Sequence, residues 1–221
     1  MKIVGHRGAA GLALENTIES IQKALELKVD AIEFDVRRTK DDQLVLCHDK
    51  NTENLNNASV CIRDSTYKDL CMQPLKNGEY MPSAEDALKA ISHKMPVIID
   101  VKESGTATAL INTLRKFPKH RITLTGYQHN DMKHVVAALP EVDFFISEHF
   151  SPIEIVHEAR RIGASGISLN AWLLNPLTYT LAKRYKLKIM LYTVNRPWVA
   201  TFLKRFYPDI LVCSDRPDKL L

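Results

Sequence analysis

The sequence AIEFDV at residues 31–36 alternates apolar and acidic side chains. Because successive side chains of a β-strand point to opposite faces, one face carries the apolar residues and the other carries Glu33 and Asp35. If this strand is buried, the two neighbouring carboxylates repel each other and are costly to desolvate unless a cation holds them. Oxygen ligands of this kind suit Mg²⁺ or Ca²⁺ better than zinc. The stretch predicts a buried strand with a metal-binding pair of carboxylates; an edge strand with both groups in solvent fits its β-branched neighbours less well.

A second strand returns directly after the first. Leu44–Cys47 follows Val36 after only seven residues, whereas parallel neighbours need a crossover of about a dozen residues or more. Asp41-Asp42 reads as a turn, so the two strands are predicted to form an antiparallel hairpin that rises from the barrel mouth. A turn centred on this dipeptide places His48 opposite Asp35, within about one residue of register. We therefore expect an imidazole beside the carboxylate pair.

Apart from this return strand, eight short apolar runs alternate along the chain with amphipathic helical stretches. This order is typical of an α/β fold, and eight repeats fit a TIM (β/α)8 barrel. The length of 221 residues lies near the roughly 200 to 250 residues at which such a barrel closes. We predict a single domain over residues 1–221, in which residues 37–80 form a β-hairpin and loop excursion over the C-terminal mouth. The eight predicted barrel strands are Ile3–His6, Ala31–Val36, Val97–Val101, Ile122–Thr125, Asp143–Ile146, Gly166–Leu169, Lys188–Thr193 and Ile210–Cys213.

Several helix starts are visible between these strands. Asn16–Lys28 has one apolar face, and its first residue and Glu19 have the spacing of an N-cap residue and its N3 partner. Ser83–Ser92 begins in a similar way. Pro176 and Pro197 each stand where a helix would make its first turn.

Further charged side chains fall at strand ends on the C-terminal rim, where barrels keep their chemistry. His6 and Arg7 end the first strand, and Asp100 and Lys102 share one face of a later strand. A structural ion pair is the alternative interpretation of Asp100 and Lys102. With His48 and the carboxylate pair, these residues combine a cation site, two basic groups for an anion and two proton-transfer groups. This mixture favours phosphoryl chemistry, whereas a sugar hydrolase would need only the carboxylates.

Composition excludes several other classes of protein. The net charge is +4 and the basic residues are scattered, so no stripe for nucleic acid is visible. No apolar run approaches the roughly 18 residues of a membrane span, and the chain enters a strand at once, so we expect no signal peptide and a cytoplasmic location. The four cysteines have no C-x-x-C spacing, which indicates reduced thiols. A homo-oligomer is compatible with the sequence, which does not fix the oligomeric state.

The order of short motifs resembles the glycerophosphodiester phosphodiesterase family. The resemblance spans almost the whole chain, and the combination of motifs is highly specific. The motifs are His6-Arg7-Gly8, Glu15-Asn16-Thr17, Glu33-Phe34-Asp35-Val36 followed by Thr39, His48-Asp49, Asp100-Val101-Lys102, Thr193-Val194-Asn195 and Ser214-Asp215-Arg216-Pro217.

Members of that family are TIM barrels that split small glycerophosphodiesters into glycerol 3-phosphate and an alcohol. The resemblance therefore implies a metal-dependent hydrolase with a small-molecule substrate. The implied site residues are His6 and His48 as general acid and base, Glu33, Asp35 and Asp100 as ligands of Mg²⁺ or Ca²⁺, and Arg7, Lys102 and Asn16 as phosphate-binding residues.

The chain departs from the family pattern at a few positions. Asp100 stands where a glutamate is usual, so the predicted metal ligand is one methylene shorter. The threonine-leucine-x-arginine run that commonly follows His48-Asp49 is absent, and Tyr192 replaces a tryptophan. Two alternatives are a lysophospholipase D-like activity on lipids with one acyl chain and a barrel that binds metal or phosphate without turnover.

Overall fold

The computed structural model describes residues 1–93, 95–148 and 151–221. All nine predicted strands are present, with bounds that differ from the predicted ones by at most two residues. They are β1 Lys2–Gly5, β2 Ala31–Arg38, β3 Leu44–Leu46, β4 Val97–Val101, β5 Ile122–Gly126, β6 Asp143–Glu148, β7 Gly166–Asn170, β8 Lys188–Tyr192 and β9 Leu211–Ser214.

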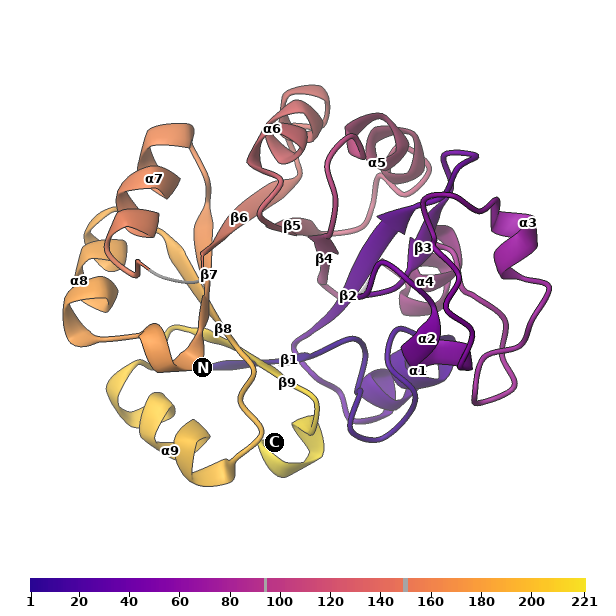
Figure 1. Cartoon of the computed structure of the whole chain (residues 1–221). Helices are drawn as coiled ribbons and strands as arrows, with labels where there is room; N and C mark the ends of the chain where they lie inside the picture. Colours follow the sequence, from indigo (N-terminus) through magenta and orange to yellow (C-terminus); the bar gives the residue numbers. More distant parts are fainter. Residues whose placement is uncertain (94, 149–150) are drawn as a thin grey trace.

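Eight of these strands form a closed parallel barrel. β1 pairs in parallel with both β2 and β9, which joins the two ends of the sheet. β3 lies outside the barrel and pairs antiparallel with the end of β2. The predicted TIM barrel with an added hairpin is therefore confirmed (Figure 1).

Helices surround the strands, as Figure 1 shows. After β9 the described chain makes only a short 3₁₀ turn, η2 Pro217–Lys219, where the repeat would place an eighth outer helix. The α-helices are α1 Ile18–Glu26, α2 Glu53–Asn56, α3 Tyr67–Leu70, α4 Ala84–Ile91, α5 Ala107–Leu114, α6 His129–Ala138, α7 Glu154–Ile162, α8 Pro176–Arg184 and α9 Pro197–Phe206, with a second 3₁₀ turn at η1 Ala171–Leu173.

The predicted cap of α1 is wrong by one residue. Thr17 is the N-cap, and it forms a capping box with Ser20 rather than with Glu19. Asn16 has a left-handed backbone with φ 56° and lies before the helix. Its side chain bonds to Asp35 of β2, so a tertiary contact decides between two equally plausible local caps. The other helix starts, at Ser83 and at the two prolines, are confirmed.

Apolar side chains form two layers on either side of the barrel wall. The outward face of β2, with Ile32 and Phe34, is fully buried beneath the helices. The inward face carries a smaller cluster at the barrel axis that includes Val4, Ile98 and Phe145. Burial of each large side chain stabilises the fold by about 1.5 to 3 kcal/mol. The polar residues of the C-terminal mouth lie next to this inner cluster along the barrel axis.

The excursion over residues 50–80 is a packed unit beside β2 and β3 (Figure 1). Leu55, Ile62 and Leu75 are buried in an apolar cluster that also includes Val45 of β3. Both carboxylate oxygens of Glu79 accept backbone N–H groups at the start of α1, at 3.0 and 2.9 Å. A carboxylate is favourable at this end of a helix because it meets unpaired N–H groups and the positive end of the dipole. The excursion is therefore fixed to the barrel.

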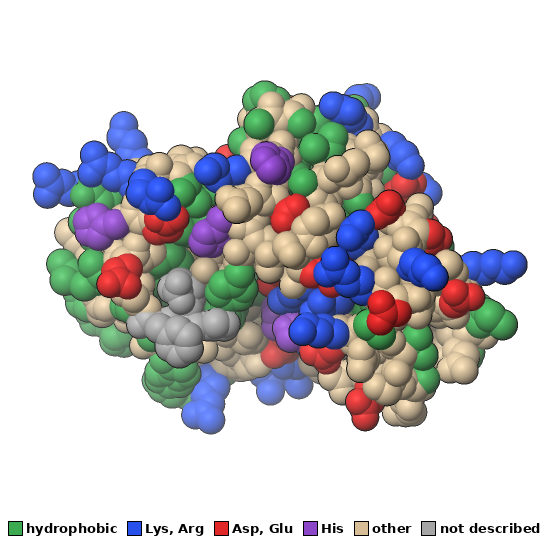
Figure 2. All heavy atoms as spheres, turned by 45° about the horizontal axis from the view of Figure 1, so that its top comes forward, with side chains coloured by type: hydrophobic (Ala, Val, Ile, Leu, Met, Phe, Trp, Pro, Cys, Tyr) green, Lys and Arg blue, Asp and Glu red, His purple; other side chains and the backbone are tan. Residues whose placement is uncertain are grey.

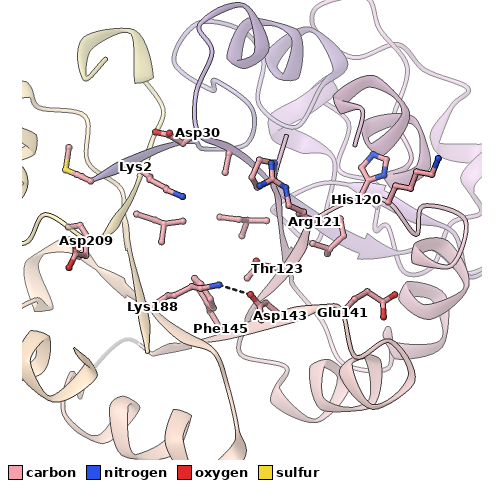
Figure 3. A pocket seen from close by; sticks show the side chains of 18 of the residues that line it. Lys2, Asp30, His120, Arg121, Thr123, Glu141, Asp143, Phe145, Lys188 and Asp209 are labelled. Atoms are coloured by element: carbon pink, nitrogen blue, oxygen red, sulfur yellow. Dashed lines mark hydrogen bonds and ion pairs between the residues drawn. The ribbon is translucent and has the colours of Figure 1, made fainter. Parts of the chain in front are cut away.

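Each end of the barrel opens into a cavity. The cavity at the N-terminal end, about 820 Å³ in volume, is lined by acidic residues as well as by lysines and arginines (Figure 3). One such pair, Lys188 and Asp143, is joined at 2.8 Å. The cavity at the C-terminal mouth is smaller, about 320 Å³. Within the described ranges, clusters of metal-ligating side chains occur only at this smaller cavity, which is therefore the candidate site.

Charged side chains of both signs lie on the surface. On the face in Figure 2, basic and acidic side chains are interleaved. None of the helices that the structure describes is both long and apolar enough to cross a membrane.

Candidate active site

Three carboxylates meet at the C-terminal mouth. Glu33 and Asp35 lie on the inward face of β2, and Asp100 on β4 is the register partner of Asp35. One oxygen from each of the three lies within 4.8 Å of the others. Glu33 and Asp35 are almost completely buried, at 3% and 1% exposure. The strand alternation thus brings these carboxylates together as the sequence predicts.

The electrostatics of the cluster leave it short of positive charge. Burial, together with the charge of Asp35, raises the pKa of Glu33 to about 8. Burial also raises the pKa of Asp100, although Lys102 opposes this shift. Within the described part of the chain, no lysine, arginine or histidine forms an ion pair with the Glu33 carboxyl group. Its Oε2 atom accepts the Arg7 backbone N–H at 2.8 Å. The three carboxyl groups offer only oxygen ligands, which a hard divalent cation prefers. A bound cation would favour the ionised form of the Glu33 carboxyl group.

Asp35 differs from Glu33 because cationic and polar groups surround it. Lys102 Nζ lies 2.9 Å from Asp35 Oδ1 and 2.7 Å from Asp100 Oδ2. The Asn16 amide donates to Asp35 Oδ2 at 2.8 Å, and Arg7 Nε lies 3.3 Å from the same oxygen. Burial alone would raise the pKa of Asp35, but Lys102, Arg7 and Asn16 together lower it. Asp35 is therefore ionised at neutral pH.

Arg7 and Lys102 bring positive charge to the cavity wall. Glu15 holds the Arg7 guanidinium through contacts of 2.9 and 2.8 Å. The predicted third member of this group, Asn16, is placed differently. It is fully buried and does not line the cavity, because its amide group is paired with the side chain and backbone of Asp35. In this position Asn16 supports Asp35.

His6 lies at the end of β1 against a carboxylate from the other end of the chain. Its Nδ1 lies 2.5 Å from Asp215 Oδ1. Asp215 Oδ2 in turn accepts the Asn195 amide at 2.7 Å. Burial lowers the pKa of His6, but the Asp215 bond and the negative charge of Glu33 outweigh burial, so the pKa is raised.

His48 follows β3 and reaches the same cavity. Its Nδ1 lies 2.9 Å from Asp49 Oδ1. The buried Arg37 guanidinium donates to the His48 backbone carbonyl at 3.0 and 2.8 Å and pairs with Glu103 at 3.2 Å. The hairpin therefore holds His48 by its backbone as well as by its side chain.

The hairpin register is one residue away from its centred prediction and within the expected tolerance. Thr39, rather than Lys40, bonds to Gln43 through its N–H at 2.9 Å. The loop thus contains three residues, and the last of them, Asp42, has φ 60°. A three-residue loop with a left-handed residue is a standard hairpin connection. Consequently Cys47, and not His48, bonds to Asp35 across the hairpin.

A family model described as the Glycerophosphoryl diester phosphodiesterase family matches residues 6–219. The chain belongs to this family. A glycerophosphodiester phosphodiesterase of Caldanaerobacter subterraneus is 24% identical over 208 residues, which cover 88% of this chain and 86% of that protein. YhdW of Bacillus subtilis is 37% identical over 109 residues, which cover 46% of this chain and 45% of that protein. A solved Oleispira antarctica phosphodiesterase, in complex with the product sn-glycerol-3-phosphate, has a TM-score of 0.91 at 21% identity and covers 100% of this chain and 95% of that chain.

Membership of the glycerophosphoryl diester phosphodiesterase family directs attention to residues that the sequence alone does not identify as site residues. Asp215 and Asn195 lie in the family motifs, but their contact with His6 depends on barrel closure. Arg37 and Glu15 act on His48 and Arg7 from the side. Glu15 lies in one of the motifs that resemble the family, but sequence spacing does not show which backbone or side chain either residue contacts.

Proposed function

We propose that this protein hydrolyses glycerophosphodiesters to glycerol 3-phosphate and an alcohol, with the help of a divalent cation and two histidines. The observation that carries the proposal is a cavity of about 320 Å³ that Glu33, Asp100, two histidines, Arg7 and Lys102 line together. The carboxylate of Asp35 lies directly against those of Glu33 and Asp100. Family membership and the product named for the Oleispira antarctica structure support the same substrate class.

Glu33, Asp35 and Asp100 would hold the cation, which is Mg²⁺ or Ca²⁺ by the chemistry of its oxygen ligands. When bound, the cation supplies positive charge beside the phosphoryl oxygens. The cation would stabilise the ionised form of Glu33, which burial disfavours in the metal-free protein by raising the pKa to about 8. Asn16 keeps Asp35 in place by bonding to its side chain and its backbone.

Arg7 and Lys102 are the proposed phosphate-binding residues. Both line the cavity, and both are held by carboxylates, Arg7 by Glu15 and Lys102 by Asp100. A guanidinium can bind two phosphate oxygens at once, whereas an ammonium acts as a point charge. Together they orient the diester and stabilise the charge that develops during the reaction.

His6 and His48 are the proposed proton-transfer residues. One removes a proton from the attacking water, and the other gives a proton to the oxygen of the departing alcohol. Asp215 and Asp49 bind Nδ1 of the respective rings. Each ring therefore has Nε2 left for proton exchange with the reactants.

An assay for released glycerol 3-phosphate tests the proposal. The soluble substrates are glycerophosphocholine and glycerophosphoethanolamine. For the lysophospholipase D alternative the substrate is lysophosphatidylcholine, and released choline is measured, because its hydrolysis gives lysophosphatidic acid rather than glycerol 3-phosphate. We expect turnover of the soluble diesters, loss of turnover with a chelator, and recovery with added Mg²⁺ or Ca²⁺. Preference for the lysolipid would favour the alternative, and full activity after exhaustive metal removal would exclude the metal role.

A further inference from the structure

A buried thiol faces the candidate active site and has no part in the proposed reaction. Cys213 lies on β9, is 1% exposed, and lines the cavity with Glu33 and His6. One ligand atom from each of these three residues lies within 4.8 Å of the others. This cluster shares Glu33 with the carboxylate cluster but adds a sulfur and a nitrogen donor.

These donors favour a different class of cation. Thiolate and imidazole ligands select soft or borderline metals such as Zn²⁺, whereas Mg²⁺ and Ca²⁺ prefer oxygen. Tetrahedral Zn²⁺, with bonds of about 2.0 to 2.3 Å, places its ligand atoms about 3.5 Å apart. The ligand atoms of the three side chains would need to approach one another by at most about 1.3 Å to reach this geometry.

The partner of His6 is also compatible with a metal site. Histidines that bind metals usually donate their other ring N–H to a carboxylate, which fixes the ring and makes the free nitrogen more basic. His6 Nδ1 contacts Asp215 at 2.5 Å, and Asn195 fixes Asp215 in turn. Nε2 is therefore the nitrogen left for a ligand in this cavity.

We propose that Cys213, His6 and Glu33 form an inhibitory site for a soft divalent cation such as Zn²⁺. On binding, the Cys213 thiol and the Glu33 carboxyl group give their protons to solvent, and the sulfur and the carboxylate bond to the metal. The bound metal takes the His6 nitrogen needed for proton transfer and the Glu33 carboxylate needed by the hard cation. Occupation of the two metal sites is thus mutually opposed. Only the inhibitory part of this inference rests on the proposed function.

Cobalt binding tests the site without an activity assay. Metal-free protein is titrated with Co²⁺, and thiolate-to-cobalt charge transfer is read in the near-ultraviolet. We expect a saturable band that Zn²⁺ displaces and that Cys213→Ser removes. Cys61→Ser is the matched control, because Cys61 is a free, partly exposed thiol outside the cavity, and it should keep the band. No band in the native protein, or an equal band in Cys213→Ser, overturns the site.

Inhibition is tested on the same variants. Zn²⁺ should inhibit the native protein in the presence of Mg²⁺ or Ca²⁺. Inhibition of Cys213→Ser should require a Zn²⁺ concentration that is higher by about tenfold or more. Circular dichroism checks folding, and Cys213→Ala replaces the serine variant if a hydroxyl is not tolerated in this buried position. Equal zinc sensitivity of the native protein and the folded variant overturns the inhibitory role. Absence of diester hydrolysis under all conditions would instead contradict the proposed function, while the cobalt band would still report on the site.

Discussion

His6 and Asp215 are 209 residues apart in the sequence, yet His6 Nδ1 lies 2.5 Å from Asp215 Oδ1. The contact exists because β1 pairs with β9 and closes the barrel. It fixes the orientation of the imidazole ring and leaves Nε2 for chemistry. The carboxylate also stabilises the protonated ring, which contributes to the raised pKa of His6.

Asp215→Asn tests this positioning role. The substitution keeps the shape of the side chain but removes its charge, so kcat/KM should fall about 10- to 100-fold. Burial lowers the pKa of His6 and the Asp215 bond raises it, so the pKa should fall in the variant. The limb of the pH profile that reports His6 should therefore move to lower pH. Asp218→Asn, which removes a surface pair with Arg216, is the control, and an unmoved limb in Asp215→Asn would contradict the assignment.

Glu33→Gln should remove metal binding but keep the fold. The pKa of Glu33 is about 8 in the metal-free protein, so at pH 7 its side chain is a neutral acid that glutamine resembles. The unfolding temperature of the metal-free variant should therefore equal that of the native protein. Saturating metal, at about 100 times its dissociation constant, should stabilise only the native protein, by about 3 kcal/mol. Thermal unfolding with and without metal measures this, with Glu26→Gln on the surface as the control.

Metal affinity should depend on pH through the same group. The Glu33 carboxyl group, whose pKa would ordinarily be 4.5, has a pKa of about 8 in the metal-free folded protein. Its contribution to the stability of metal-free protein is thus lost as pH rises from about 4.5 to about 8. Binding a cation requires the ionised form, so apparent affinity should rise with pH and level off above about 8, with release of a proton. Calorimetry in buffers of different ionisation enthalpy measures that proton, and a binding enthalpy that is the same in all buffers would contradict the role of Glu33.

The barrel could be predicted from sequence because its signals are local. The alternation in AIEFDV places Glu33 and Asp35 on one face whatever lies around them. The hairpin could be predicted because the segment between the two strands is too short for the crossover that parallel strands need. Its exact register did not, because turn residues show where a loop lies but not that Thr39 and Gln43 enclose three residues. The left-handed backbone of Asp42, which goes with a loop of this length, becomes known only from the structure.

Contacts between distant segments could not be predicted in the same way. Asn16 and Thr17 both begin a plausible capping pattern, and the bond from Asn16 to Asp35 decides between them. Nothing in the sequence around Arg37 indicates that its guanidinium is buried against the His48 carbonyl, as the structure shows. In each case the deciding partner lies on another strand or loop.

Asp100→Glu tests whether the shorter side chain tunes the metal site. Space around Asp100 is limited, because a Cβ atom added to Gly126 would lie 3.0 Å from Asp100 Oδ1. Asp100 also shares the Lys102 ammonium with Asp35. The extra methylene should therefore change metal affinity or rate by up to about tenfold, or about 1.4 kcal/mol. Metal titrations of both proteins measure the change, and identical metal dependence would show that Asp100 is not a direct ligand.

The last prediction concerns His6 and His48, and it separates an enzyme from a binding module. Both line the cavity, and each has its Nδ1 next to an aspartate. Because a proton-transfer group contributes about 10²- to 10⁴-fold to rate, His6→Ala and His48→Ala should each lower kcat by about that much. Metal binding, measured by calorimetry, should remain, because neither ring belongs to the carboxylate cluster.

A second substrate assigns the two roles of these histidines. A nitrophenyl phosphodiester has a leaving group that needs little protonation, so it should restore the rate of the variant that lacks the general acid and not that of the other. The double variant should lose little more than the slower single variant, since groups that act in one step are not additive. The native protein should show a bell-shaped dependence of kcat/KM on pH, which reports the pair as a unit. His120→Ala is the control, because this histidine lines the opposite cavity and bonds to the Leu88 carbonyl. If both single variants keep near-native rates on the natural diester, protons move by another route and the proposed mechanism is wrong.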